Sequence, residues 1–326
     1  MMRVLSGVRP TGKLHLGHWV GVLSKWIELQ KKYECLFMIA DRHALMSEYR
    51  TSFLIKDNII DNVSDWLAWG VNPEKSIIFV QSQVPLHLEL FSLLSLLTPL
   101  GWLFRCPTFK EQIRELKDKE INTYAFLGYP VLQAADILIY KANFVPVGED
   151  QLPHLEITRE IVRRFHFIYK KNIFIEPQPI LTTGSRLLGL DKRKMSKSYN
   201  NFITLDEEED SIEAKVISMF TDPLRIKKED KGHPDECNVF SYYNIFKKEM
   251  KDEVYDWCIN AKRGCKECKK NLAQIIKELI VPKREKKREI LKDRELIYSI
   301  LEEGKKKAEK IATQTWEEVR EVVGLL

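Results

Sequence analysis

Three short apolar runs in the first quarter of the chain, separated by segments of helical length, constrain the fold most strongly. The runs RVLSGV (3–8), CLFMIAD (35–41) and SIIFVQS (76–82) have the length of buried strands and are bounded by turn or charged residues. Segments 18–33 and 53–70 between them carry apolar residues at helical spacing, and the second closes on Gly70. Strands that alternate with helices predict an α/β fold with a parallel sheet.

The pattern changes near residue 185. A loop rich in Lys, Ser and Asn (191–202) leads into segments that we expect to be helical, at 206–220, 238–258, 268–281 and 285–323. The apolar stripe of the last helices has to pack on something, and the first domain is the obvious surface.

Charge and hydropathy exclude several classes of protein. The formal charge of +5 comes from 52 basic and 47 acidic residues, far from the balance of a protein that coats nucleic acid, although basic runs gather in the last third. Each run alone is typical of a solvated helix face; together they are compatible with an RNA-facing surface. With no window of membrane-spanning length and no secretory signal, we expect a cytoplasmic protein without a membrane partner.

Six cysteines in a cytoplasmic protein predict thiols or metal ligands rather than disulfides. Cys35 and Cys106 lie apart in apolar surroundings and are expected to be buried structural thiols. The others have the spacing C-x20-C-x6-C-x2-C, and four thiolates can hold either tetrahedral Zn²⁺ or a [4Fe–4S] cluster. These candidate metal ligands are Cys237, Cys258, Cys265 and Cys268.

The stretch SGVRPTGKLHLGHWVG runs from the first strand into the first helix. Its glycines keep the backbone slim, and a helix N-terminus offers unpaired N–H groups to a phosphate. His15 and His18, three residues apart, would face the same ligand. A metal site and ordinary packing are the competing interpretations, but no carboxylate or cysteine lies close in sequence to complete a metal site.

A second stretch, DKRKMSKSYNN (191–201), interleaves basic side chains with small hydroxyl residues and has no apolar period. Such a loop suits a mobile clamp on a polyphosphate, whereas a basic loop considered alone is usually just solvated. The two stretches together indicate a nucleotide whose developing charge is neutralised by the protein.

HLGH (15–18) and KMSKS (194–198) resemble the two signatures of class I aminoacyl-tRNA synthetases. Within that class, SGVRPTGKLHLGH, ADRHAL (40–45), YPVLQAADILIY (129–140) and VPVGEDQLPHLEITREI (145–161) resemble the blocks of bacterial tryptophanyl-tRNA synthetases, in the same order. The resemblance covers nearly the whole chain.

The resemblance implies a Rossmann-like catalytic domain (1–185), a helical anticodon-binding domain (186–288) and C-terminal helices that return to the catalytic domain (289–326). It implies that the carboxylate of L-tryptophan attacks the α-phosphate of ATP, bound with Mg²⁺, to give tryptophanyl-adenylate and pyrophosphate. Tryptophan then passes to the 2′-hydroxyl of the terminal adenosine of tRNA-Trp. The expected state is a homodimer, and catalysis rests on positioning and electrostatics.

The resemblance also assigns residues to these steps. Catalysis is expected from His15, His18, Lys110, Lys194, Lys197 and Ser198. ATP binding is expected from Arg9, Thr11, Gly12, Gly17, His18, Gly148, Asp150, Gln151, Lys194, Met195, Ser196 and Lys197. Tryptophan binding is expected from Leu5, Gly7, His43, Tyr129, Gln133, Asp136, Val145, Val147 and Gln151.

Asp136 is expected to set the amino-acid specificity, because the indole N–H is a donor and a carboxylate in apolar surroundings is a strong acceptor. A structural role for Asp136 is the alternative. Gln133 on the same helix face would also suit a phenol, so a tyrosine-specific enzyme remains open. A second alternative is an RNA-binding paralogue without activity, against which the intact signatures argue.

For the four-cysteine site, the resemblance favours iron. A subset of bacterial tryptophanyl-tRNA synthetases carries a [4Fe–4S] cluster at similarly spaced cysteines, and structural Zn²⁺ remains the alternative. The site would stiffen the region that reads the anticodon, with phosphate contacts from Lys262, Arg263, Lys266, Lys269 and Lys270.

Overall fold

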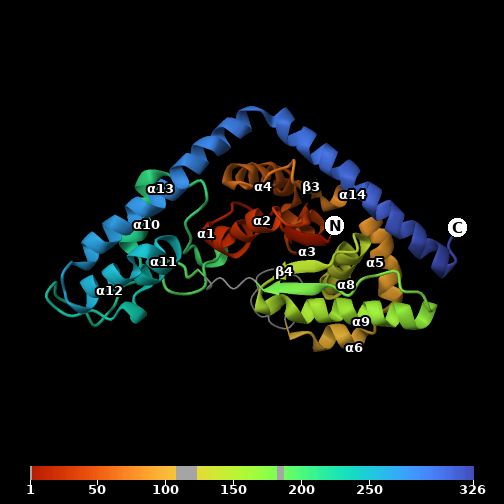
Figure 1. Cartoon of the computed structure of the whole chain (residues 1–326), viewed down its shortest axis with the longest axis horizontal. Helices are drawn as coiled ribbons and strands as arrows, with labels where there is room; N and C mark the ends of the chain where they lie inside the picture. The colour runs from red at the N-terminus through yellow and green to blue at the C-terminus, as the bar shows by residue number, and fades with distance from the viewer. Residues whose placement is uncertain (1, 108–122, 182–186) are drawn as a thin grey trace.

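The predicted parallel sheet is present in the computed structural model, which describes residues 2–107, 123–181 and 187–326 (Figure 1). Within those residues the sheet has five strands in the order β3-β2-β1-β4-β5, and every neighbouring pair is parallel. The strands are β1 (Arg3–Val8), β2 (Glu34–Ile39), β3 (Ser76–Val80), β4 (Phe144–Val147) and β5 (Gln178–Leu181).

The strand order makes this a doubly wound sheet. From β1 the chain builds outward through β2 to β3, and it then returns to the other side of β1 with β4 and β5. The order therefore reverses between β1 and β4, where Val4 is the register partner of Phe144. In open sheets of this kind, ligands bind outside the carboxyl ends of the strands at the point of reversal.

Both faces of the sheet are buried, as a parallel sheet requires. Side chains alternate along β2: Cys35, Phe37 and Ile39 join the core on one face, whereas Leu36 and Met38 join the core on the other. The apolar runs found in the sequence are therefore central strands.

Helices connect the strands and build the second half of the chain. Before β4 they are α1 (Leu16–His18), α2 (Ser24–Leu29), α3 (Asp41–Glu48), α4 (Ile55–Trp69), α5 (Leu86–Leu97), α6 (Leu100–Arg105) and α8 (Tyr124–Ile139). After β4 they are α9 (Leu152–Tyr169), α10 (Glu209–Ser218), α11 (Asn238–Phe246), α12 (Lys251–Ile259), α13 (Cys265–Lys292) and α14 (Arg294–Val323).

The two longest helices, α13 and α14, form an arch over the α/β layer (Figure 1). α13 carries α10 to α12 along its first half, and α14 runs back beside β3. Gly304 of α14 makes this close approach possible, because a Cβ at that position would lie 1.8 Å from the carbonyl oxygen of Ile78. Asp293 separates the two helices and accepts a hydrogen bond from the Leu296 N–H at 3.1 Å.

Several expected helix boundaries are wrong. α10 is shorter than 206–220, and the helix expected at 238–258 is two helices separated near Lys247, whose backbone is not helical. A break was expected at Pro282, yet α13 continues through it to Lys292. Ile276 and Ile280 before the proline are buried, and so are Arg284 and Lys287 after it, and this packing outweighs the hydrogen bond that proline removes.

The helix expected at 18–33 is also interrupted. A π-helical turn at Trp19–Leu23 separates α1 from α2, which ends at Leu29. By contrast, α4 ends at Gly70 as expected, with φ of 112° at the glycine. Cys35 and Cys106 are buried thiols, as predicted.

Candidate active site

The two signature segments lie side by side, although about 180 residues separate them. The first segment leaves β1 after Val8, and residues 14–16 pair with residues 203–205, which directly follow the second segment. The Leu16 N–H donates to Ile203 O at 2.9 Å, and the Leu205 N–H donates to Leu14 O at 3.0 Å. Both segments are therefore anchored at the carboxyl end of β1, beside the point where the strand order reverses.

Two glycines of the first segment lie close to side chains of the second segment. Gly12 has φ of +113°, which only glycine adopts without strain, and its Cβ position would lie 3.5 Å from Lys197 Nζ. The Cβ position of Gly17 would lie 3.6 Å from Met195 Sδ, and Met195 is buried. A larger residue at position 12 or 17 would push on the second segment.

His15 and His18 are a contacting pair of neutral imidazoles. Their ring centroids are 3.9 Å apart, and His18 Nδ1 accepts from the His15 N–H at 3.1 Å. Burial, reinforced by nearby Lys197, lowers the pKa of His15 to about 4. Burial also lowers the pKa of His18 well below its usual range. Near pH 7 the pair can exchange hydrogen bonds with a ligand but adds no positive charge.

The second signature is shaped by Asn201, which sequence reasoning did not single out. Its side chain is buried; Oδ1 accepts from the Ser196 N–H at 2.9 Å, and Nδ2 donates to Lys194 O at 3.1 Å and to Asp191 Oδ1 at 2.6 Å. One amide thus fixes both ends of the loop that carries Lys197. The only sequence signal was an asparagine pair, Asn200 and Asn201, one residue after the signature.

Positive charge at the site comes from Lys197, Lys194 and Arg9. Burial, together with the neighbouring Arg9, lowers the pKa of Lys197 to about 8. Lys194 is exposed beside it, as is Arg9, and Thr11 is half-buried in the first segment. Two further expected catalytic groups fall outside the described part of the chain, namely residue Lys110 and the side chain of Ser198.

Next to β4, the GEDQ stretch joins a hydrogen-bonded chain. Gln151 Nε2 donates to Asp150 Oδ2 at 3.1 Å, and Gln151 Oε1 accepts from His154 Nδ1 at 3.0 Å. His154 is fully buried, and burial lowers its pKa to about 4, so its Nε2 accepts from the Tyr129 hydroxyl at 2.6 Å. His154 therefore links Tyr129 to Gln151. Both residues were predicted to bind the amino acid, but nothing in the sequence indicates that they are connected.

Asp136 on α8 is the centre of a buried polar cluster. Its Oδ1 accepts from Gln81 Nε2 at 2.7 Å and from His87 Nδ1 at 2.6 Å, and its Oδ2 accepts from His43 Nε2 at 2.7 Å. Burial opposes its ionisation, but the donors from His43 and His87 outweigh burial and lower the pKa of Asp136. Tyr140 completes the cluster by donating its hydroxyl to His87 Nε2 at 2.8 Å.

Two of these partners, Gln81 and His87, were not predicted. Gln81 follows β3 and His87 opens α5, so only the sheet order brings them to Asp136. Each carboxylate oxygen can accept two hydrogen bonds, so within the contacts of the described residues Oδ2 keeps one acceptor direction open.

The remaining residues that were predicted to bind tryptophan lie around the point of strand reversal. Leu5 is buried on β1 and Gly7 is exposed near its end. Val145 and Val147 are buried on neighbouring β4. Gln133 lies three residues before Asp136 and is half-buried, so both occupy one face of α8.

The four cysteines of the second half line one small cavity of about 30 Å³, together with Arg225 and Arg263. All four are free thiols. Among the described residues, however, no group of three or more His, Cys, Asp or Glu side chains is arranged closely enough to hold a metal ion.

Comparisons with known proteins identify the family of the chain. Residues 1–280 match the family described as tRNA synthetases class I (W and Y). The chain is 46% identical to a tryptophan–tRNA ligase of Thermotoga maritima, and the comparison covers 100% of both chains. It is 40% identical to one of Ralstonia nicotianae, with 99% of this chain and 98% of that one covered.

Among solved structures, the tryptophanyl-tRNA synthetase of Campylobacter jejuni complexed with ADP and tryptophan has a TM-score of 0.89 and 31% identity. That comparison covers 99% of this chain and 100% of the other. The extent of the family match and the identity over the full length together show that this chain belongs to the class I tRNA synthetases of the tryptophan and tyrosine family.

Proposed function

We propose that the protein is a tryptophan–tRNA ligase: it activates L-tryptophan with ATP and transfers it to the terminal adenosine 2′-hydroxyl of tRNA-Trp. The observation that carries this proposal is the meeting of both signatures at the strand reversal of a sheet against which α8, with Asp136, is packed. The full-length identity to tryptophan–tRNA ligases supports the choice of amino acid.

Phosphate chemistry is assigned to the two signature segments. Lys197 and Lys194 neutralise the charge that develops on the α-phosphate and pyrophosphate, which arrive with Mg²⁺ as part of the nucleotide. His15 and His18 are neutral and act as hydrogen-bond partners of the nucleotide. Arg9, Thr11 and the slim backbone at Gly12 and Gly17 complete the proposed ATP contacts, with Met195 and Ser196 following from the second segment.

The ribose and the α-amino group are assigned to the chain of hydrogen bonds beside β4. Asp150 accepts from ribose hydroxyls, and Gly148 allows the sugar to approach the backbone. Tyr129 and Gln151 address the α-amino group of the amino acid. Because His154 bonds to both, it holds them in one arrangement before the substrate arrives.

Recognition of the indole is assigned to the open acceptor direction of Asp136 Oδ2. His43, which already donates to that oxygen, walls the ring together with Leu5, Gly7, Val145 and Val147. The cluster around Asp136 keeps the carboxylate charged in a buried place, so the indole N–H meets a fixed strong acceptor.

Tyrosine is the alternative substrate, because Gln133 and Asp136 on one helix face could share a phenol hydroxyl. ATP–pyrophosphate exchange measured with each amino acid separates the two. We expect exchange with tryptophan and a discrimination of roughly 10⁴ against tyrosine, because the phenol hydroxyl does not stand where the indole N–H stands and would leave a buried polar group of a site shaped for indole unpaired. Preference for tyrosine would overturn the assignment, and no exchange with either would favour an inactive RNA-binding paralogue.

For tRNA, we propose the division into a catalytic domain (1–185), an anticodon-binding domain (186–288) and returning C-terminal helices (289–326). The boundary at 185 lies outside the described residues. Among the basic side chains near the cysteines, Lys269 is engaged inside the fold, because Nζ donates to the carbonyls of Ile217 at 2.8 Å and Met219 at 2.7 Å. Lys266 and Lys270 are the better candidates for phosphate contacts.

Variants at Lys266 and Lys270 test this division of labour. Replacing both with glutamine is expected to weaken tRNA charging while ATP–pyrophosphate exchange is unchanged. Equal losses in the two assays would show that the domains are not separate in function. A homodimer is part of the proposal, and its mass in solution can be measured by light scattering.

We further propose that the four cysteines hold a [4Fe–4S] cluster, with Zn²⁺ as the alternative. The donor chemistry fits either, because four thiolates share one cavity with Arg225 and Arg263, whose charges offset the excess negative charge of a four-thiolate site. Burial raises the pKa of Cys237, but the N–H groups of Phe240 and Val239 oppose that effect, as expected for a sulfur that is to carry charge. The bound metal would tie α11, α12 and α13 together.

Metal content of protein purified without oxygen tests this assignment. Brown colour with iron and sulfide near four per chain supports the cluster. One zinc per chain in a colourless sample supports the alternative, and neither metal would remove the site.

The helices of the described residues are too short or too polar to cross a membrane. A cytoplasmic location is proposed on the strength of the tRNA substrate.

A further inference from the structure

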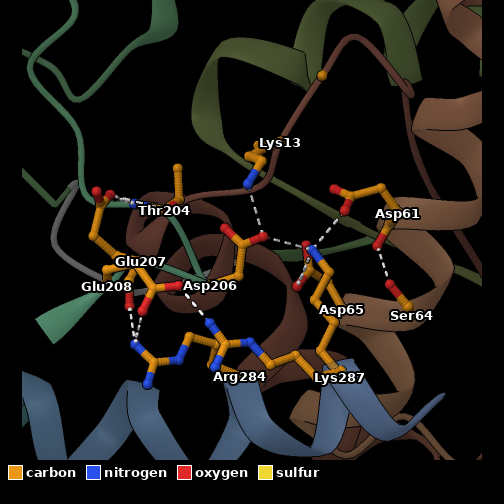
Figure 2. A network of polar contacts seen from close by, with 12 residues as sticks. Lys13, Asp61, Ser64, Asp65, Thr204, Asp206, Glu207, Glu208, Arg284 and Lys287 are labelled. Atoms are coloured by element: carbon orange, nitrogen blue, oxygen red, sulfur yellow. Dashed lines mark hydrogen bonds and ion pairs between the residues drawn. The ribbon is translucent and has the colours of Figure 1, made fainter. Parts of the chain in front are cut away.

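One buried lysine connects α13 to the active-site half of the protein. Lys287 of α13 has a side chain only 3% exposed, and its Nζ lies 2.7 Å from Asp61, 3.0 Å from Asp65 and 3.1 Å from Asp206. Lys13 lies 2.9 Å from the same oxygen of Asp206. Figure 2 shows these five side chains converging between α4, α13 and the loop that carries Lys13. We call them the Lys287 network.

The network reaches both signature segments. Asp206 directly follows residues 203–205, which pair with residues 14–16 of the first segment. Lys13 is itself part of the first segment. On α4, Asn62 is the neighbour of Asp61, and its buried side chain donates to Gly12 O at 3.1 Å. Lys287 thus joins three elements that all hold the loop around Gly12, where Lys197 Nζ packs.

A second set of contacts fixes the same helix to the same loop. Arg284, one turn before Lys287, donates to Glu207 O at 3.1 Å and to the Glu208 carboxylate at 2.8 Å (Figure 2). Glu207 in turn accepts from the Thr204 N–H at 2.9 Å. Residues 204–208 are therefore held by α13 at two successive turns.

The charge balance shows that Lys287 does more than fill space. Without it, the carboxyl groups of Asp61, Asp65 and Asp206 would face one another with side chains only 26%, 1% and 14% exposed, at a cost that the exposed Lys13 could offset only in part. Asp61 also acts on Lys197, whose ammonium form it favours against burial and Arg9. Lys287 is the close partner of Asp61, so Lys197 stays available for a phosphate.

We propose that Lys287 is a positioning residue for ATP activation: by holding Asp206 and Asp61 it sets the relative position of the two signature segments and leaves Lys197 free for the nucleotide. This inference rests on the proposed function. Lys287 touches neither substrate, so it acts through Asp206, Asp61 and the loop around Gly12.

The test compares Lys287→Met with a matched variant on the same helix. Lys277→Met removes an ion pair of the same length, 2.7 Å to Glu213, which joins α13 to α10 and does not reach the signature segments. ATP–pyrophosphate exchange with tryptophan gives kcat and KM for each substrate, and thermal unfolding gives the stability of each variant.

For Lys287→Met we expect kcat/KM for ATP to fall roughly 10- to 100-fold, as displacement of positioning groups does, while KM for tryptophan stays unchanged. Lys287→Arg restores part of that loss, because it keeps the charge. Lys277→Met lowers the unfolding temperature but leaves the ATP parameters alone. If Lys287→Met does not fold, the exposed Lys13→Met decides, with a smaller loss in the same ATP parameters.

The outcomes separate this inference from the proposed function. If the wild-type protein shows no tryptophan-dependent exchange, the proposed function fails. If the wild-type protein is active but Lys287→Met and Lys277→Met differ only in stability, Lys287 is a structural residue and the inference is overturned. Unchanged ATP parameters in Lys13→Met overturn it as well when Lys287→Met cannot be purified.

Discussion

The buried ammonium group of Lys197 is expected to lower the free energy of unfolding of the ligand-free protein. Catalysis requires this charge, so the loss of stability accompanies its role. Burial, with Arg9 nearby, lowers its pKa from 10.5 to about 8. That difference corresponds to at most about 3 kcal/mol by which folding disfavours the ammonium form. Because the unfolded chain binds more protons than the folded protein between pH 8 and 10.5, the penalty is complete below pH 8 and disappears as the pH rises through that range.

We consider Lys197→Met, which keeps most of the unbranched side chain and removes the charge. At pH 7 we expect its free energy of unfolding, measured by urea denaturation without ligands, to exceed that of the wild type by up to about 3 kcal/mol. The same variant should form adenylate more slowly by roughly 10²-fold or more, because a charge that stabilises the transferring phosphate is lost.

The pH dependence gives an independent check on the same group. In the free wild-type protein, kcat/KM for ATP should fall as Lys197 loses its proton, by about fivefold between pH 8 and pH 9. Lys197→Arg should remove this decline, because arginine stays charged. His15 and His154, each with a pKa of about 4, stay neutral throughout this range. A Lys197→Met variant no more stable than wild type, together with a flat pH profile to pH 9.5, would show that Lys197 is not a buried ammonium group.

Other residues give shorter tests. Asp136→Asn removes one charged acceptor and should lower kcat/KM for tryptophan by roughly 10- to 100-fold while leaving KM for ATP unchanged; equal loss for both substrates would argue for a structural role. Burial raises the pKa of Asp65 from 3.8 to about 7, so the folded protein holds a proton that the unfolded chain releases, and stability falls as the pH rises through that window. Asp65→Asn should therefore add more stability at pH 8 than at pH 5 in urea denaturation, and a gain independent of pH would contradict this. Asn201→Ala should cost about 2 kcal/mol, since it leaves buried groups of the second signature unpaired, and should raise KM for ATP; a change in stability alone would remove Asn201 from the nucleotide site.

The sequence predicts the parts of the fold that depend on local patterns. β1 has the bounds of its apolar run, and β2 and β3 differ from theirs by one or two residues. The short strands β4 and β5 were not predicted, because their four residues carry prolines and show no period. Pro282 misled the boundary of α13, where tertiary packing outweighs the local preference.

The candidate site shows the same limit. His15, Lys197 and Asp136 could be named from motifs, because each motif is a short run of residues. His87 and Gln81, which hold Asp136, come from other parts of the chain and are brought to it only by the sheet order. The Lys287 network joins residues from four separate segments, so no local pattern could have indicated it.

Transfer of tryptophan to tRNA requires both signatures, the amino-acid site and the helical half in one reaction. The measurement is ATP-dependent charging of total bacterial tRNA with each standard amino acid, supplied in labelled form. The account predicts that tryptophan alone is attached and that addition of purified tRNA-Trp raises the yield. Attachment of tyrosine instead, or exchange with tryptophan but no transfer to any tRNA, would contradict it.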